Sequence, residues 1–268
     1  MEKNFKLGVI GAGFMSSAII NGIINANILK PSEILVSDVS DLALEKVSLR
    51  GINVTTDNKF LANSCEFVLF AIKPQNSEQV FAQIKDCACE KFISIMAGVK
   101  IEKISKSLNK TKIARCMPNT PCSIGCGAVG IDLSRFDNAN DVNFVKSLFS
   151  SIGQVVEVEE KLLNAVTGIS GSSPAYFYLF LKGIIDAGVK QGLDENTAKL
   201  LATNTMLGSA KMVLHNSDKS LEQLINAVCS KGGTTIEAIK TYEESGLTSI
   251  TSNAVDACVK RAKELEEI

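Results

Sequence analysis

Two glycine-rich stretches of the sequence have the composition of anion-binding turns. The first is "VIGAGFMSSAI", residues 9–19, where Gly11 and Gly13 stand between an apolar run and an apolar helical pattern. Gly11 permits a tight turn, and Gly13 lets a pyrophosphate approach the backbone at a helix N-terminus. Ser16 replaces the third glycine of the usual pattern but is still small enough for close helix–strand packing. The stretch therefore predicts dinucleotide binding.

The second stretch is "SKGGTTIEAI", residues 230–239. Gly232 and Gly233 free the backbone to turn its N–H groups inward, and two threonine hydroxyls follow at the positive end of the next helix. Because the first turn serves the pyrophosphate, this second turn is predicted to bind an anionic group of the other reactant. An ordinary capped helix start is the alternative, and Lys231 either adds charge or is a solvated lysine.

Further candidates for cofactor contacts follow three other apolar runs. Asp38 ends "ILVSD", where a carboxylate would accept a hydrogen bond from a ribose 2′-OH and repel a 2′-phosphate, favouring NADH. Its alternative role is to cap the following helix, in which Lys46 and Arg50 stand one and two turns along. The stretches "FAIKPQ" and "IMAGVK" place small residues where backbone must approach a nicotinamide ribose. Lys73, in the first of them, could equally be a solvated loop lysine.

The elements that must position these residues differ between the two halves of the chain. Up to about residue 160, seven β-rich runs alternate with helical patterns, which is typical of βαβ units and a mainly parallel sheet. After residue 163 the pattern is helical only, with helices expected at residues 173–191, 194–215, 220–229, 234–245 and 248–266. Ser173, Asp194 and Thr248 are expected caps, and glycines 192 and 246 follow helix ends. We predict a Rossmann-type domain over 1–162 and an all-helical domain over 163–268.

Composition narrows the functional classes. Lysine and arginine total 28 against 29 acidic residues in 268, so no charge surplus points to nucleic acid or an anionic membrane. The longest apolar run, "PAYFYLFL", is far shorter than the roughly 20 residues of a spanning helix, and no signal peptide is recognisable. We expect a soluble, cytoplasmic protein. Eight cysteines without a CxxC, and the single His215 at an expected helix end, predict core thiols and no metal site.

Five motifs together resemble the pyrroline-5-carboxylate reductases, which make proline from its cyclic imine precursor. They are "GAGFM", "AIKPQ", "RCMPNTP", "GISGSSPAYFY" and "SKGGTTIEAI", in that order and nearly end to end. The family usually has glycine where Ser173 stands and often proline where Lys231 stands. Both departures leave the candidate chemical groups in place.

The resemblance implies an NAD(P)H-binding Rossmann domain and a helical domain that interleaves with a partner subunit. It implies a homodimer whose active site lies at the interface, with a ring of dimers as a larger assembly. The segment "SPAYFYLFLKGIIDAGV", apolar on nearly every face, independently predicts a partner. Cofactor contacts are implied at Ile10, Gly11, Ala12, Gly13, Phe14, Met15, Asp38, Asn58, Ala71, Ile72, Lys73, Pro74 and Ala97. Substrate contacts are implied at Glu160, Ser230, Gly232, Gly233, Thr234 and Thr235, with Thr235 in the catalytic role beside the ring nitrogen.

The implied cofactor is NADPH or NADH, since Asp38 stands where the family has serine or arginine. Reducing a protonated C=N bond needs hydride delivery without a strong base, which suits a chain with one histidine. A rival, the hydroxyisobutyrate type of dehydrogenase, needs a lysine where this sequence has Phe177. A second rival is a dinucleotide-sensing binding protein without turnover, which would have no need of a second anion turn.

Overall fold

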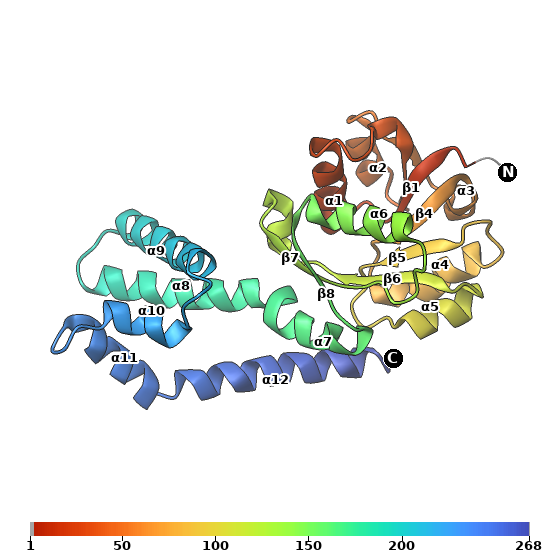
Figure 1. Ribbon diagram of the computed structural model, residues 1–268. Coiled ribbons are helices and arrows are strands. Elements are labelled where there is room, and N and C mark those ends of the chain that lie inside the picture. Colours follow the sequence, from red (N-terminus) through yellow and green to blue (C-terminus); the bar gives the residue numbers. More distant parts are fainter. Residues whose placement is uncertain (1–2, 268) are drawn as a thin grey trace. The chain divides into compact units, whose positions relative to one another are not determined.

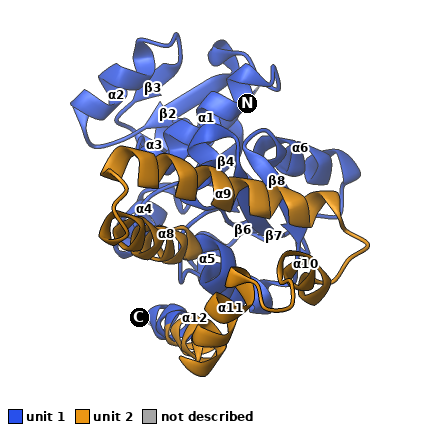
Figure 2. Cartoon of the chain, turned by 90° about the vertical axis from the view of Figure 1, so that its left-hand side faces the viewer, with its two compact units in different colours: residues 1–172, 258–268 blue, residues 173–257 orange. Residues whose placement is uncertain are grey.

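The computed structural model describes residues 3–267 (Figure 1). It divides the chain into two compact units, which are coloured separately in Figure 2. The sheet unit comprises Met1–Ser172 and Cys258–Ile268, and the helical unit comprises Ser173–Ala257. These units differ from the predicted domains, because residues 163–172 and the C-terminal eleven residues belong with the sheet. The helical pattern of these segments carries no information about which unit they pack against.

An eight-stranded sheet forms the sheet unit, with the order β3-β2-β1-β4-β5-β6-β7-β8. Neighbouring strands are parallel except for the antiparallel pair β6 and β7. The seven predicted strands are all present, and the mainly parallel Rossmann-type architecture is confirmed. The short β3 was not predicted, since its three residues lie in a polar stretch. The bounds are β1 Phe5–Ile10, β2 Ile34–Ser37, β3 Asn53–Thr55, β4 Cys65–Phe70, β5 Lys91–Ser94, β6 Lys112–Met117, β7 Gly127–Asp132 and β8 Gly153–Glu157.

Helices cover both faces of this sheet (Figure 1). Alternate residues of β4 enter two separate apolar clusters, Phe67 and Leu69 in one and Val68 and Phe70 in the other, as the period of a strand requires. The α-helices of the unit are α1 Phe14–Asn25, α2 Asp41–Ser48, α3 Asn58–Ser64, α4 Ser77–Ile84, α5 Ile101–Leu108, α6 Ala139–Ser150 and α7 Leu163–Val166. Short helical turns are η1 Pro31–Glu33, η2 Pro74–Asn76, η3 Thr120–Ile124, η4 Glu160–Leu162 and η5 Thr167–Gly171. Of the α-helices, the sequence predicted α1, α2, α4 and α5, whereas α3, α6 and α7 were not predicted.

Helices alone make up the helical unit, as the sequence predicts. They are α8 Ser173–Lys190, α9 Glu195–His215, α10 Leu221–Val228, α11 Thr234–Glu244 and α12 Leu247–Leu265, whose last turns belong to the sheet unit. Asp194 caps α9 by accepting from the Thr197 N–H at 3.0 Å. The expected cap at Thr248 is wrong, because α12 begins one residue earlier, and Ser173 is the first residue of α8 rather than a residue before it. Gly192 and Gly246 have positive φ, which lets the chain turn after α8 and α11.

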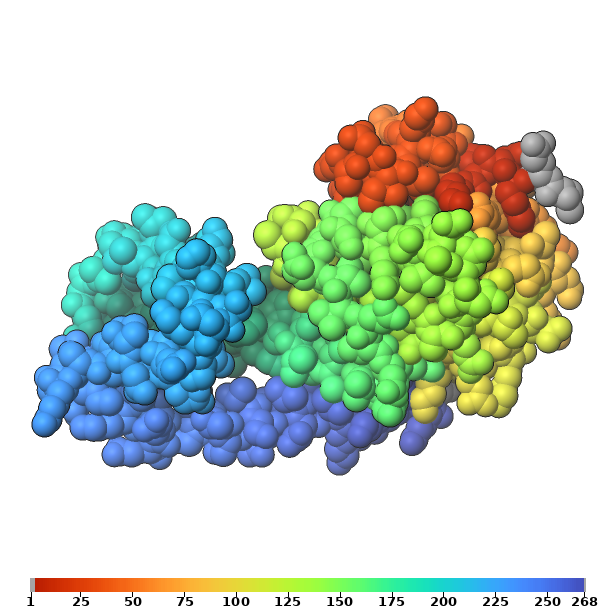
Figure 3. Space-filling model, viewed as in Figure 1, coloured from red at the N-terminus to blue at the C-terminus, as the bar shows by residue number. Residues whose placement is uncertain are grey.

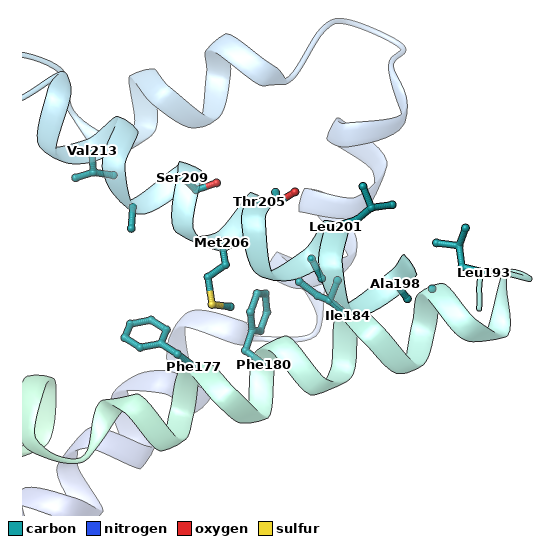
Figure 4. A pocket seen from close by; sticks show the side chains of 13 residues that line it. Phe177, Phe180, Ile184, Leu193, Ala198, Leu201, Thr205, Met206, Ser209 and Val213 are labelled. Atoms are coloured by element: carbon teal, nitrogen blue, oxygen red, sulfur yellow. The ribbon is translucent and has the colours of Figure 1, made fainter. Parts of the chain in front are cut away.

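Large apolar side chains remain exposed over the helical unit. A pocket of about 600 Å³ lies between α8 and α9, and Phe177, Phe180 and Met206 project into it (Figure 4). Tyr178 and Leu179 on α8 are 64% and 74% exposed, and Leu214 on α9 is 81% exposed. An apolar surface of this extent is typical of a protein–protein interface.

Over residues 3–267, none of the helices combines the length and the apolar character that crossing a membrane requires.

Candidate active site

Gly11 brings the ends of β1, β2 and β4 together. Its N–H donates to the Ser37 carbonyl at 2.7 Å, and its φ is +106°, which favours glycine. A Cβ at this position would lie 2.5 Å from the carbonyl oxygen of Ala71. Any side chain would therefore push β4 away from β1. The first glycine of the motif is therefore required for the close packing of the chain at the carboxyl ends of β1 and β4.

Gly13 meets a different requirement, because it faces open space. It is the N-cap residue of α1, has an ordinary φ of −81°, and has nothing within 4 Å of an added Cβ. Ser16 is buried, and its hydroxyl donates to the Gly13 carbonyl at 2.9 Å, so the small residue at the third motif position packs as expected. The open N-terminus of a twelve-residue helix fits the pyrophosphate of a dinucleotide.

Asp38 is fixed beside this turn by both of its carboxylate oxygens. Oδ2 accepts from the Ala12 N–H at 2.7 Å, and Oδ1 accepts from the Ser40 N–H at 2.9 Å. Ser40, and not Asp38, caps α2 by accepting from the Ala43 N–H. The alternative reading of Asp38 as the helix cap is therefore wrong. An oriented carboxylate at the end of β2 fits a ribose hydroxyl donor.

A pocket of about 450 Å³ adjoins the turn, between α1 and α2. Ala12, Gly13, Phe14 and Ser17 line one side of it, and Ser40, Leu42, Ala43, Lys46, Val47 and Arg50 line the other. Neither Lys46 nor Arg50 forms an ion pair with another described residue. Two cations beside an anion-binding turn can bind phosphate oxygens. Sequence spacing placed both cations in the helix, which is wrong for Arg50, because α2 ends at Ser48 and Arg50 lies in the turn that follows. The spacing also did not show that they share a pocket with Gly13.

The remaining cofactor candidates gather at the carboxyl ends of the same parallel strands. The Ala71 N–H donates to the Ile10 carbonyl at 2.9 Å, and Lys73 is the N-cap residue of η2, which begins at Pro74. Asn58 accepts from the Ser37 hydroxyl at 2.6 Å and donates to Gln83 at 2.7 Å. Ala97 follows β5, the next strand of the sheet, and is half-buried. Hydrogen bonds thus join the candidates that follow β1, β2 and β4 to one another. The Ile72 side chain also packs close to the turn, since its Cγ2 would lie 3.1 Å from a Cβ added at Gly11.

Glu160, implied by the resemblance as a substrate ligand, binds two groups of the protein through one carboxylate oxygen. Its Oε1 accepts from the Ile101 N–H at 2.7 Å and from Arg115 Nη1 at 3.2 Å, while its own N–H donates to Asp132 at 2.6 Å. Arg115 is 1% exposed, so the carboxylate neutralises a buried charge. Glu160 thus neutralises Arg115 and also accepts from the first N–H group of α5, so it has a structural role in this chain. Arg115 opens the motif "RCMPNTP". Nothing in the sequence indicates that this arginine is buried or paired with Glu160, 45 residues along the chain.

The second glycine turn keeps its helix end free of side-chain caps. Gly232 has a φ of +72°, Gly233 is the N-cap residue of α11, and no side chain accepts from the first turn of that helix. A Cβ at Gly233 would lie 2.4 Å from the Ser230 hydroxyl oxygen. Thr234 and Thr235 are the first two residues of α11, the former exposed and the latter half-buried. The Gly233 N–H donates to the Ser230 carbonyl at 3.0 Å, while no side chain accepts from the N–H groups of Thr234 and Thr235. These two groups lie at the positive end of α11, where an anion would bind.

Five of the eight cysteines are buried in the structure. Cys65, Cys87, Cys89, Cys116 and Cys122 are buried, as expected for core thiols. Burial raises the pKa of Cys65 to about 12 and that of Cys89 to about 11, so both remain protonated thiols at neutral pH. Within the part of the chain that the structure describes, no three His, Cys, Asp or Glu side chains are grouped to hold a metal ion.

Comparison with known proteins matches both halves of the chain. The family model described as pyrroline-5-carboxylate reductase dimerisation matches residues 160–265, and the model described as NADP oxidoreductase, coenzyme F420-dependent, matches residues 6–98. The pyrroline-5-carboxylate reductase of Synechocystis is 36% identical over 264 residues, 98% of each chain. That of Methanosarcina acetivorans is 37% identical over 267 residues, again 98% of each chain. The chain belongs to the pyrroline-5-carboxylate reductase family.

Solved structures of this family have the same fold from end to end. The pyrroline carboxylate reductase of Plasmodium falciparum, solved with NADP bound, is 34% identical and has a TM-score of 0.87, covering 99% of this chain and 100% of its own. The pyrroline-5-carboxylate reductase of Coxiella burnetii is 35% identical with a TM-score of 0.89, covering 98% of both chains. The resemblance drawn from the five motifs is confirmed.

The two glycines of the first turn give a matched pair of substitutions. We expect Gly13→Ala to leave the thermal unfolding midpoint unchanged, because its Cβ meets no protein atom, and to weaken NADH binding by about tenfold or more by occupying the space of the pyrophosphate. Gly11→Ala should lower the free energy of unfolding by about 1–3 kcal/mol because of its positive φ and the Ala71 clash. Calorimetric titration and thermal unfolding measure the two effects. Unchanged NADH affinity in Gly13→Ala would place the pyrophosphate elsewhere.

Proposed function

We propose that the chain catalyses the NAD(P)H-dependent reduction of 1-pyrroline-5-carboxylate to L-proline, the last step of proline biosynthesis. The observation that carries the proposal is the full-length similarity to reductases of this name, together with two anion-binding turns of the kinds the reaction needs. The decrease in NADH or NADPH absorbance on adding 1-pyrroline-5-carboxylate tests it. A dinucleotide sensor would bind the cofactor in that assay but leave its absorbance unchanged.

The groups of the chain bind and orient the two reactants. We place the pyrophosphate at the Gly11–Gly13 turn, the adenosine ribose at Asp38, and the nicotinamide half along Ala71–Pro74 and Ala97. When bound, the cofactor would supply a hydride to the imine carbon, and the C=N bond of the protonated imine would become the C–N bond of proline. Ser230–Thr235 would bind the substrate carboxylate, with the Thr235 hydroxyl accepting a hydrogen bond from the ring N–H. We leave Glu160 out of this substrate set, because its carboxylate is bound to Arg115 and to the Ile101 N–H.

A second copy of the chain is the partner we assign to the helical unit. The match to the dimerisation family model and the exposed apolar side chains of α8 and α9 support this assignment. We propose that each active site combines the cofactor-binding loops of one chain with the Ser230–Thr235 turn of another. A ring of dimers would be the larger assembly, and a reducing compartment such as the cytoplasm suits the buried free thiols.

The dimer proposal predicts a stable association. At assay concentration, sedimentation should give at least twice the mass of the chain, and an even multiple of it if the dimers form a ring. Phe177→Asp, which puts a charge into the pocket between α8 and α9, should shift the protein toward monomer and lower the specific activity in parallel. Lys199→Asp, a surface change elsewhere on α9, serves as the control. A fully active monomer would contradict the proposal.

Thr235 provides the test of the substrate turn. Hydrogen bonds to charged groups contribute roughly 1.5–3 kcal/mol, so Thr235→Ala should lose on the order of tenfold to a hundredfold in kcat/KM for 1-pyrroline-5-carboxylate. NADH binding should be nearly unchanged. Thr241→Ala, at an exposed position of the same helix, is the matched control and should retain native activity. Loss of NADH affinity with an unchanged substrate KM would assign the turn to the cofactor instead.

Asp38 is predicted to make NADH at least as good a cofactor as NADPH. A carboxylate facing a 2′-phosphate costs on the order of 1–3 kcal/mol when both groups are partly desolvated, while Lys46 and Arg50 keep NADPH usable. Asp38→Ser should therefore improve kcat/KM for NADPH relative to NADH. A native preference for NADPH above roughly tenfold, about 1.4 kcal/mol, would mean that the carboxylate does not face the 2′ position.

A further inference from the structure

The end of α12 contacts the loop between β5 and α5. Gly98, in this loop, has a φ of +73°, and an added Cβ would lie 2.9 Å from the Leu265 Cβ and 3.1 Å from the Leu265 carbonyl. In the space-filling view the dark-blue end of the chain lies beside the yellow residues that include this loop (Figure 3). Both segments belong to the sheet unit. The backbone of Gly98 is therefore packed directly against the C-terminal turn.

Glu266, the next residue, adds two ion pairs to this contact. Its Oε1 lies 3.0 Å from Arg115 Nη1, and its Oε2 lies 3.3 Å from Lys100 Nζ. The Glu266 side chain is only 8% exposed. Burial opposes its ionisation, but hydrogen bonds from Asn164, Arg115 and Lys100 and the charge of Arg115 outweigh burial and lower the pKa of Glu266. The carboxylate is therefore charged and oriented at neutral pH.

The same loop is held from a second direction. Glu160 accepts from the Ile101 N–H at 2.7 Å and pairs with the same Nη1 atom of Arg115 at 3.2 Å. The loop is thus held at three successive points. Gly98 packs against Leu265, Lys100 pairs with Glu266, and the Ile101 N–H donates to Glu160. Ala97, the cofactor candidate of β5, immediately precedes these three points.

We infer that Glu266 is a positioning residue for the nicotinamide half of the cofactor. It acts on the loop directly through Lys100, and indirectly through Arg115, which also pairs with the Glu160 carboxylate that accepts from the Ile101 N–H. These contacts hold the loop that presents Ala97 after β5. The inference rests on the proposed function, in which the nicotinamide half lies along Ala97. It assigns to the C-terminal turn of α12, far from either glycine turn in sequence, a part in binding the cofactor.

The test separates the nicotinamide half of the cofactor from its adenosine half. Glu266→Gln keeps the shape of the side chain and removes its charge, and calorimetry gives the Kd for NADH and for ADP, which lacks the nicotinamide and its ribose. We expect the Kd for NADH to rise about 3- to 30-fold while the Kd for ADP changes less than twofold, because only NADH reaches residues 97–100. In turnover assays the KM for NADH should rise, with the KM for 1-pyrroline-5-carboxylate nearly unchanged. Binding is measured without substrate, so a failed reductase activity and a failed positioning role are told apart.

Glu264→Gln is the matched control, since Glu264 is in the same turn of α12 but pairs with the exposed Arg261. It should leave both dissociation constants unchanged. If Glu266→Gln does not fold, Lys100→Gln decides, because it removes the half-exposed partner and leaves the buried pair with Arg115. That variant should raise the Kd for NADH about two- to fivefold and leave the Kd for ADP unchanged. Equal changes in NADH and ADP binding, or none in either, would overturn the inference.

Discussion

Arg115 places a positive charge inside the sheet unit at 1% exposure, and a buried charge is tolerated only when opposite charges pair with it. Glu160 and Glu266 supply those charges, both through the Nη1 atom, while Nε and Nη2 have no partner among the described residues. Loss of either carboxylate would leave the buried guanidinium with a single charged partner. The pairing therefore ties η4, which begins at Glu160, and the residue after α12 to the same buried charge.

The loops that carry the proposed cofactor contacts, after β1, β4 and β5, are held in two ways. The charges around Arg115 hold the loop after β5, and close backbone packing holds all three. Gly11 lets β1 approach Ala71 of β4, and Gly98 lets the β5 loop approach Leu265. At both positions, the absence of a side chain lets two segments of backbone pack directly against each other. Backbone packing therefore fixes the positions of these loops. Such rigidity suits a hydride transfer that depends on positioning rather than on a strong base.

Local patterns predicted the strands and most helices because apolar periodicity records burial directly. Of the missed elements, β3, α7 and α3 have only three, four and seven residues and carry little of that signal. The twelve-residue α6 was missed despite its buried Val145, Leu148 and Phe149. The site was predictable where a motif imposes its own geometry, as at Gly11, Gly13 and Gly232. It was not predictable where a role depends on a distant partner. Family resemblance implied a substrate contact for Glu160, and nothing near it in sequence reveals its pairing with Arg115. Likewise, the helical pattern of α12 does not show that its end joins the sheet unit.

The two glycine turns differ in what surrounds them, and this difference bears on how the proposed site works. The first lies at the carboxyl ends of β1, β2 and β4, beside the Asp38 carboxylate and two cations, Lys46 and Arg50, that form no ion pair with another described residue. These groups match the ribose hydroxyls and the phosphates of the adenosine half that we propose to bind there. The second begins an exposed helix, with Thr234 open to solvent and Lys231 as the adjacent charge. A solvated turn binds a carboxylate weakly, because water competes for the same N–H groups and hydroxyls. Strong binding and productive hydride transfer at Ser230–Thr235 thus require a surface that covers the turn. A second chain that buries the apolar face of the helical unit would supply such a surface, so that dimerisation and exclusion of water from the imine become the same event.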